Sequence, residues 1–208
     1  MKKSVLALGA AVVAGGLGFA GAAHAVAYFG AGSNPAGLPV ATDFRLNPGH
    51  TGHMLYLPYY TAQGANSTLL NITNTDTKRG KVVKVRFRGA ANSDDVLDFT
   101  VLLSPGDVWT ATVSKGVNGY AYLTSSDSTC TLPTTLGQGA SFKGQRLPAY
   151  ASDAVKQAHT REGYMEVLNM ADVPEGSVLY KNIKHVKGVP GDCAGTAVQN
   201  LISTDVLA

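Results

Sequence analysis

Two cysteines, Cys130 and Cys193, are the residues whose type and number point most directly to a chemical bond, because the 208-residue chain has no others. Neither has a second cysteine or a histidine at the spacing of a zinc site, so two distant thiols make a poor metal centre. A catalytic thiol would leave its partner without a role. In an exported protein a disulfide is the expected outcome. We therefore predict a Cys130–Cys193 bond.

Two histidines, His50 and His53, are the next candidates. They lie three residues apart in the stretch NPGHTGHM and would hold a metal ion if a third ligand came from elsewhere. Loop histidines are more typically solvated, so we expect no metal site and no cofactor. A secreted metal-dependent hydrolase stays open as the weakest alternative.

Motifs of common catalytic sites do not occur in the sequence. The stretch GASFKG around Ser141 lacks the second glycine of a nucleophile elbow, and neither familiar phosphate-binding glycine loop is present. The carboxylates are dispersed, and Asp94 with Asp95 is typical of a turn rather than of an acid–base pair. We predict no catalytic residue and no enzymatic activity.

Tyrosines gather in two places, and their rings offer the remaining route to a ligand. They are Tyr56, Tyr59 and Tyr60 in LYLPYY, and Tyr120 and Tyr122 in GYAY. Such tyrosines either stack on sugar rings or fill a core with the hydroxyl at its rim. Core or rim packing is the more typical use, and a carbohydrate-binding module of the cell surface is the alternative. Trp109 is expected in the core.

The elements that position these residues follow from a basic stretch, KVVKVRFR at 81–88, which resembles a polyanion site at first sight. Alternation along a strand instead separates its apolar and basic side chains onto opposite faces. The apolar set is Val83, Val85 and Phe87, and the basic set is Lys84, Arg86 and Arg88. The acids of the following NSDDVLDF are expected as cross-strand partners. The stretch therefore predicts a strand with one solvated face.

Similar runs recur at intervals of about a dozen residues, separated by turn residues, and this spacing is typical of antiparallel sandwiches. We predict an all-β fold, an Ig-like antiparallel β-sandwich with one short helix in a long loop. The expected strands are 54–60, 67–74, 81–88, 96–103, 108–114, 120–125 and 163–170. Because Pro58 cannot donate to a ladder, the first strand should lie at an edge or carry a bulge.

Regularity falls after Ser126. The following residues predict a long polar loop, and SDAVKQAHTRE predicts the helix, with Ser152 or Asp153 as its N-cap. The segment from Pro174 onward predicts a second strand pair, in GSVLYKNIKHV and TAVQNLISTDV.

The N-terminus predicts export. Two lysines precede an uncharged apolar run, and small residues then form a cleavage site between Ala25 and Val26, so residues 1–25 are a predicted signal peptide. The apolar run is shorter than the ~20 residues of a membrane-spanning helix. No later apolar segment is long enough, so we expect no membrane span in the mature chain.

The charge balance excludes a nucleic-acid partner. The chain has 17 basic and 14 acidic residues, and removing the two signal-peptide lysines leaves 15 against 14, a net charge near +1. Nucleic-acid binders carry a stronger field of one sign.

Residues 26–53 are rich in glycine and proline and predict an extended N-terminal arm. Residues 54–208 are the predicted sandwich domain, which is either complete or truncated at its C-terminal end. An edge strand beside an extended arm would allow one subunit to lend a strand to the next, and the alternative is that the arm folds back on its own domain. The expected partners are thus the protein itself or surface glycans.

Three stretches resemble a known group of sequences: LPYYTAQGANSTLLNITNTDTKRGKVVKVRFRGAANSDDVLDFTVLLSPGDVWTATVS, CTLP and TREGYMEVLNMADV. They are similar to uncharacterised bacterial cell surface proteins of the kind found in β-proteobacteria. The resemblance implies export to the surface and supplies no activity or site residues. We expect a secreted or surface-displayed structural or adhesive protein, with a periplasmic location as the alternative.

Overall fold

The structure is a computed structural model that describes residues 46–49 and 51–202. The predicted signal peptide and most of the predicted arm lie outside these residues, as do His50 and the last six residues.

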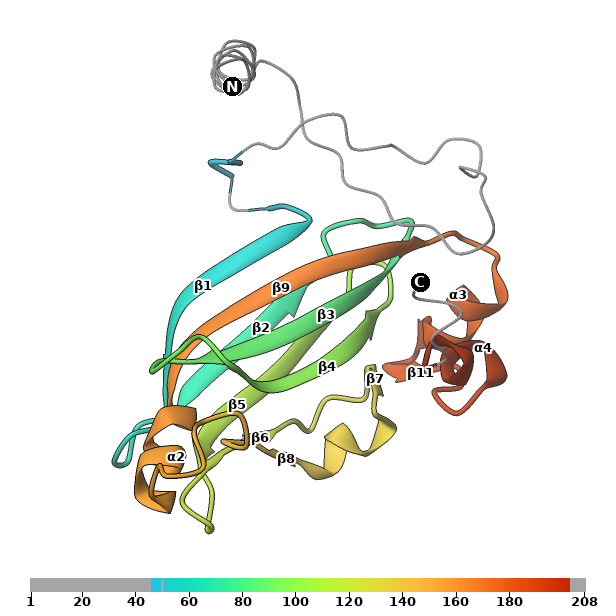
Figure 1. The fold of residues 1–208 in the computed structure, drawn as a ribbon. Helices are drawn as coiled ribbons and strands as arrows, with labels where there is room; N and C mark the ends of the chain where they lie inside the picture. The colour runs from blue at the N-terminus through green and yellow to red at the C-terminus, as the bar shows by residue number, and fades with distance from the viewer. Residues whose placement is uncertain (1–45, 50, 203–208) are drawn as a thin grey trace, which may run out of the picture.

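Antiparallel strands are the main regular elements of the described chain (Figure 1). They are β1 (Met54–Thr61), β2 (Thr68–Thr73), β3 (Gly80–Gly89), β4 (Asp95–Leu103), β5 (Val108–Lys115), β6 (Ala121–Thr124), β7 (Cys130–Leu132), β8 (Ala140–Ser141), β9 (Glu162–Val173), β10 (His185–Val186) and β11 (Val189–Pro190). All seven predicted strands are confirmed, with boundaries that differ by at most three residues.

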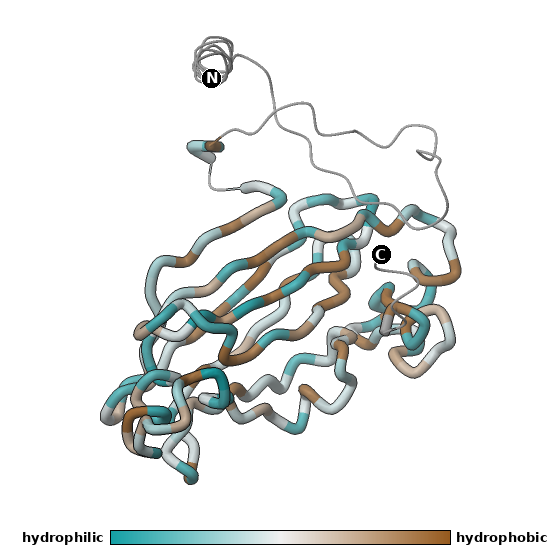
Figure 2. Tube along the Cα trace, in the orientation of Figure 1, coloured by the Kyte–Doolittle hydropathy of each residue, from teal (hydrophilic) through white to brown (hydrophobic). Residues whose placement is uncertain are grey.

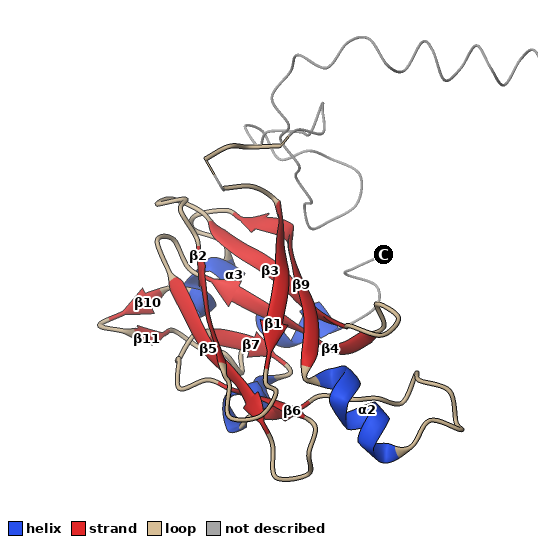
Figure 3. Cartoon of the chain, turned by 90° about the vertical axis from the view of Figure 1, so that its left-hand side faces the viewer, coloured by secondary structure: helices blue, strands red, loops and turns tan. Residues whose placement is uncertain are grey.

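The strands form two main sheets that pack face to face. The first has the order β1-β9-β3-β4-β7 and the second the order β2-β5-β6-β8, while β10 and β11 form a separate hairpin. Figure 3 shows β2 and β5 on one side and β3 and β9 on the other. The predicted all-β architecture of packed antiparallel sheets is thereby confirmed, whereas the Ig-like topology stays a prediction.

The main core lies between the two sheets, and both contribute to it. Its largest fully buried side chains are Trp109, Tyr60, Phe87, Phe99, Leu123 and Met165. The ring centroids of Phe99 and Trp109 are 5.5 Å apart, and Phe87 meets Tyr60 edge to face. Trp109 is therefore the core residue that its strand pattern predicted.

Strand β3 follows the predicted alternation. Its side chains Val83, Val85 and Phe87 are buried in the main core, while Lys84, Arg86 and Arg88 lie half-buried on the outer face. Along the strands of Figure 2 hydrophobic and hydrophilic positions alternate in the same way. The basic stretch is a central strand of the first sheet.

Strand β1 lies at the edge of the first sheet and carries an irregularity where proline predicted one. The register with β9 shifts between Leu57 and Tyr60, on either side of Pro58. Both features expected from this proline are thus present, because it has no N–H to give to the ladder.

One end of the first sheet is buried on its outer face as well. Val82, Leu102 and Ala171 point there into a second core, formed with the segment Val178–Ile202, which we call the helical cap. The cap contains α3 (Val178–Ile183), α4 (Thr196–Gln199) and a 3-10 turn, η2 (Asn200–Ile202). Its innermost residue is Ile183, which is fully buried.

The disulfide joins the helical cap to the first sheet. Cys130 begins the edge strand β7, and its sulfur bonds to Cys193, which precedes α4. The predicted pairing is confirmed.

A further helix, α2 (Asp153–Thr160), lies at the opposite end of the sheets from α3 and α4 (Figure 1). The Ser152 hydroxyl accepts a hydrogen bond from the Val155 N–H at 3.4 Å, so Ser152 is the N-cap that was expected. Among the described residues no helix is long and apolar enough to cross a membrane.

Two sequence predictions are wrong. The second strand pair expected after Pro174 is the helical cap, because Ser177 caps α3 with its hydroxyl and starts a helix there. The expectation of a single short helix fails for the same reason. The polar loop after Ser126 also contains β7, a 3-10 helix, η1 (Thr134–Gln138), and β8.

Candidate functional site

The outer face of the first sheet, away from the helical cap, gathers aromatic and charged side chains in register. Tyr56 on β1 lies opposite Glu166 on β9, which lies opposite Arg86 on β3, which lies opposite Asp98 on β4. One row therefore crosses four strands. We call this surface, with its neighbours Tyr164 and Arg88, the ionic face.

The tyrosines of the ionic face lie at its edge. The ring centroids of Tyr56 and Tyr164 are 5.1 Å apart, with the planes tilted by 42°. Tyr56 is 57% exposed. Aromatic rings at the rim of a polar surface are the groups on which sugar rings stack.

The charges of the ionic face are paired across strands. Arg88 Nε donates to Glu166 Oε2 at 3.1 Å, and Lys84 pairs with Asp98. Arg86 Nε lies 3.9 Å from a carboxylate oxygen of Asp95. The acids Asp95 and Asp98 lie in the stretch NSDDVLDF, which the sequence predicted as the partner of the basic strand.

Burial alters the protonation of two of these groups. Burial raises the pKa of the Asp95 carboxyl, and the neighbouring charge of Asp98 adds to the effect. Burial opposes the charge of Arg88, but its hydrogen bond and ion pair with Glu166 outweigh this and raise the pKa of the guanidinium. Arg86 Nε and Asp95 Oδ1 are buried without hydrogen-bond partners. Near its centre the ionic face thus has two buried polar atoms that make no hydrogen bond to the described residues.

The remaining predicted tyrosines lie elsewhere. Tyr60 is 1% exposed in the main core, and burial raises the pKa of its hydroxyl. Tyr59 is exposed next to Pro58 on β1. Tyr122 lies on β6 in the second sheet, where its hydroxyl donates to Gln138 O, and Tyr120 is half-buried just before that strand. The structure therefore does not gather the five tyrosines into one surface.

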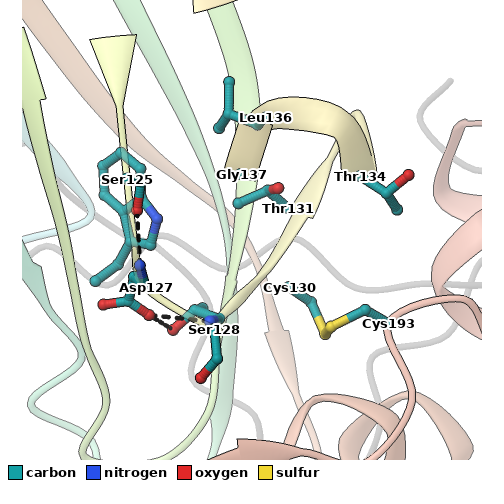
Figure 4. Close-up of a pocket in the computed structure, with 11 residues that line it drawn as sticks. Ser125, Asp127, Ser128, Cys130, Thr131, Thr134, Leu136, Gly137 and Cys193 are labelled. Atoms are coloured by element: carbon teal, nitrogen blue, oxygen red, sulfur yellow. Dashed lines mark hydrogen bonds between the residues drawn. A yellow bond between two sulfur atoms is a disulfide. The ribbon is translucent and has the colours of Figure 1, made fainter. Parts of the chain in front are cut away.

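A small pocket of about 140 Å³ lies beside the disulfide (Figure 4). Its lining is rich in hydroxyl groups and comes from β5, from the segment after β6, from η1 and from the cap. The lining residues are Trp109, Ser125, Asp127, Ser128, Thr129, Cys130, Thr131, Thr134, Leu136, Gly137 and Cys193.

The charged residue of this pocket already has partners. One carboxylate oxygen of Asp127 accepts hydrogen bonds from the Thr129 N–H and hydroxyl, and the other accepts from Thr110. Burial opposes its ionisation, but these hydrogen bonds outweigh burial and lower the pKa of Asp127. Asp127 therefore holds the loop in shape.

A serine, a histidine and an aspartate meet where β4 turns into β5. Ser104 Oγ lies 2.8 Å from His185 Nδ1, and Asp107 Oδ2 lies 3.4 Å from the same nitrogen. A catalytic triad requires the two partners on different ring nitrogens, so that the histidine can relay a proton to the serine. This cluster instead connects the β4–β5 turn to the β10–β11 hairpin.

Of the two histidines considered as metal ligands and expected to be solvated, His50 lies outside the described residues. His53 directly precedes β1, and its carbonyl accepts from the Asn169 N–H. Within the described part of the chain no group of three or more His, Cys, Asp or Glu side chains is placed to hold a metal ion.

Tyr56 is the one residue of the ionic face that the sequence argument singled out as a site residue, and it named neither Tyr164 nor Glu166. Their strand was predicted, and alternation would have placed both on one face. Their position beside Tyr56 and Arg88 required the pairing of β9 with β1 and β3, which strand patterns alone do not give.

No protein-family model, no curated protein and no solved structure matches this chain.

Proposed function

We propose that the protein is a secreted or surface-displayed structural or adhesive β-sandwich protein without catalytic activity. The observation that carries the proposal is the Cys130–Cys193 disulfide, which fastens the helical cap to the first sheet. Disulfides persist in oxidising compartments outside the cytoplasm. The predicted signal peptide and the resemblance to bacterial cell surface proteins agree with that compartment.

The proposal includes an Ig-like arrangement of the two sheets. Hairpin pairing of β3 with β4 and of β5 with β6, together with the crossing from β2 to β3 between sheets, supports a Greek-key sandwich. In this arrangement β9 lies between β1 and β3, and a relative with the same fold would have the same strand order.

Cell fractionation tests the location. The full chain carrying an epitope tag at its C-terminus is expressed beside a variant that lacks residues 1–25. We expect the full chain to be shortened at its N-terminus, to leave the cytoplasm and to be cleaved by protease added to intact cells. Release by osmotic shock without protease sensitivity would indicate the periplasm. An unprocessed cytoplasmic chain would contradict the proposal.

A carbohydrate-binding module is the second candidate, because the exposed Tyr56 contacts the half-buried Tyr164 beside the Arg88–Glu166 ion pair. Stacking rings next to charged hydrogen-bonding groups are the chemistry of sugar recognition. On a glycan array we expect binding that the Tyr56→Ala variant loses. The control is Tyr150→Ala, since Tyr150 is 91% exposed in the loop between β8 and α2. Equal binding by both variants, or none by the native protein, would exclude the face as a sugar site.

A further inference from the structure

A lysine, an aspartate and an asparagine meet at the end of the main core, away from the ionic face. Lys81 Nζ donates to Asp172 Oδ1 at 2.7 Å, and Asn169 Nδ2 donates to the same oxygen at 3.0 Å. The amine and the carboxamide are therefore held against a single carboxylate oxygen.

Strand register explains why these side chains meet. Lys81 on β3 lies opposite Asp172 on β9 and opposite Leu103 on β4, and Leu103 belongs to the main core. The register of β3 with β9 shifts between Val82 and Val83, which leaves Met170 as an extra residue on β9. That bulge puts both Asn169 and Asp172 on the side facing the main core.

The cluster is enclosed. Asp172 is 3% exposed, and 16% of the Lys81 side chain is accessible. Asn169 Oδ1 is buried without a hydrogen-bond partner. A buried amide oxygen without a donor is destabilising, and native structures contain few such groups. The packing around Asn169 does not explain why its Oδ1 is buried without a hydrogen-bond donor.

We propose that Lys81 and Asn169 react to form an intramolecular amide bond, with Asp172 as the catalytic residue. Asp172 takes a proton from the Lys81 ammonium, and the neutral amine attacks Cγ of Asn169. The C–N bond to Nδ2 breaks as Asp172 returns the proton to the leaving nitrogen. The products are a Lys–Asn amide and one ammonia, which leaves with the second lysine proton as ammonium. No oxidant, metal or cofactor takes part.

Geometry favours the first step, because the Lys81 amine already donates to Asp172 Oδ1 at 2.7 Å, along the path that the proton takes. A protonated Asp172 also supplies the donor that Asn169 Oδ1 lacks, and that donor would stabilise the oxyanion formed by attack. Both reactants donate to one oxygen, which keeps the amine in the neighbourhood of the carboxamide and lowers the entropic cost of bringing them together.

Asp76 has a different part in this site. Its Oδ2 lies 3.3 Å from Lys81 Nζ, while its Oδ1 accepts from the Lys78 and Arg79 N–H groups. Burial opposes its charge, but these hydrogen bonds and the nearby Lys81 outweigh burial and lower the pKa of Asp76. Asp76 thus stays ionised and stabilises the ammonium form of Lys81. It slows the reaction, and only Asp172 contacts both reacting groups.

Intact mass measured on the purified full-length or processed chain under reducing conditions tests the proposal. We expect a mass below that of the sequence by one ammonia, and after trypsin a branched peptide that joins Lys81 to Asn169. Asp172→Asn and Lys81→Arg should keep the sequence mass, and Asp76→Asn should accelerate the loss of ammonia. A circular dichroism spectrum of each variant verifies its fold.

A second source of ammonia loss provides the control. Asn118 precedes Gly119 in an exposed turn, where ring closure of the asparagine onto the next backbone nitrogen would also release ammonia. The Asn118→Ser variant should still lose ammonia. An unchanged mass of the native chain after prolonged incubation, or a loss that maps to Asn118 alone, would overturn the proposal without depending on any variant. Neither result bears on where the protein resides.

Discussion

At the scale of single residues, His159 shows how the interior controls a titratable group. Its Nδ1 accepts a hydrogen bond from the Ala91 N–H at 3.1 Å, while its Nε2 is buried without a partner. The ring packs against Gly89, where a side chain would collide with it. A protonated imidazole would lose the Ala91 bond and place a charge in this enclosed site. Burial accordingly lowers the pKa of His159, against the weaker attraction of Asp94.

The first prediction concerns pH. Because the folded pKa of His159 lies below the unfolded value of ~6.5, the unfolded chain binds a proton first as the pH falls. Folding stability should therefore fall from about pH 6.5 downward and level off below the folded pKa. Urea unfolding between pH 7.5 and 4.5 measures this. The His159→Gln variant should lose part of the slope, and an identical slope in both proteins would contradict the assignment.

The second prediction concerns Gly163, where β9 meets β3. A Cβ at this position would lie 1.8 Å from the carbonyl oxygen of Arg88, so the backbone would have to move. Gly163→Ala should lower the free energy of unfolding by about 3 kcal/mol. At Gly137 an added Cβ meets nothing within 4 Å, so Gly137→Ala should change stability by less than about 0.5 kcal/mol. Similar effects of the two substitutions in urea unfolding would contradict this packing.

At the scale of elements, the bulge in β9 allows this one strand to contribute buried side chains to both cores. Before Met170 its buried side chains Met165 and Val167 point between the sheets, and after it Ala171 and Val173 point toward the helical cap. Because of the one extra residue, odd-numbered side chains of β9 face the main core before the bulge and the helical cap after it. The helical cap therefore depends on this irregularity as much as on its own apolar residues.

The third prediction concerns the bond that fastens the cap. Replacing both Cys130 and Cys193 by serine should lower stability by about 4 kcal/mol in the chain-entropy model. The cap should loosen first, because its second core is smaller than the main one. Hydrogen exchange should show faster exchange in α3 and α4 than in β3 and β4. Uniform protection across both regions would show that packing alone holds the cap.

Sequence patterns predicted the strands well because turn residues and alternation are local. They placed Trp109 in the core and Val85 opposite the cations for that reason. The helical cap was missed because α3 has only six residues, too few to separate a helical from a strand period. Ser177 before it was the available signal. The meeting of Lys81 with Asp172 depends on the bulge at Met170 and on non-local pairing, which the sequence does not reveal.

At the scale of the whole molecule, β1 is the element that could join one copy to another. Among the described residues it pairs only with β9, and its exposed side chains include Met54 and Tyr59. We propose that residues 26–51 of one subunit add to this edge on the next. A head-to-tail contact of this kind need not close and can produce filaments.

The fourth prediction tests that assembly. Light scattering on the mature chain should show oligomers whose size grows with concentration, and deletion of residues 26–51 should give a monomer. A variant with Leu69→Ser on β2, an exposed residue at the edge of the other sheet, should assemble like the native chain. A monomeric native chain at high concentration would refute the proposal.

The disulfide also determines how the molecule would respond to tension along its length. Cys130 and Cys193 are 63 positions apart, and the ring that they close contains all of α2 and β9. When the ends of the chain are pulled, force passes across the sulfur bridge, so the enclosed residues cannot extend. About 200 Å of contour length stays hidden, at 3.3–3.6 Å per residue. Single-molecule stretching of the Lys81→Arg variant, which cannot form the Lys81–Asn169 amide, should reveal this length only after a reductant is added.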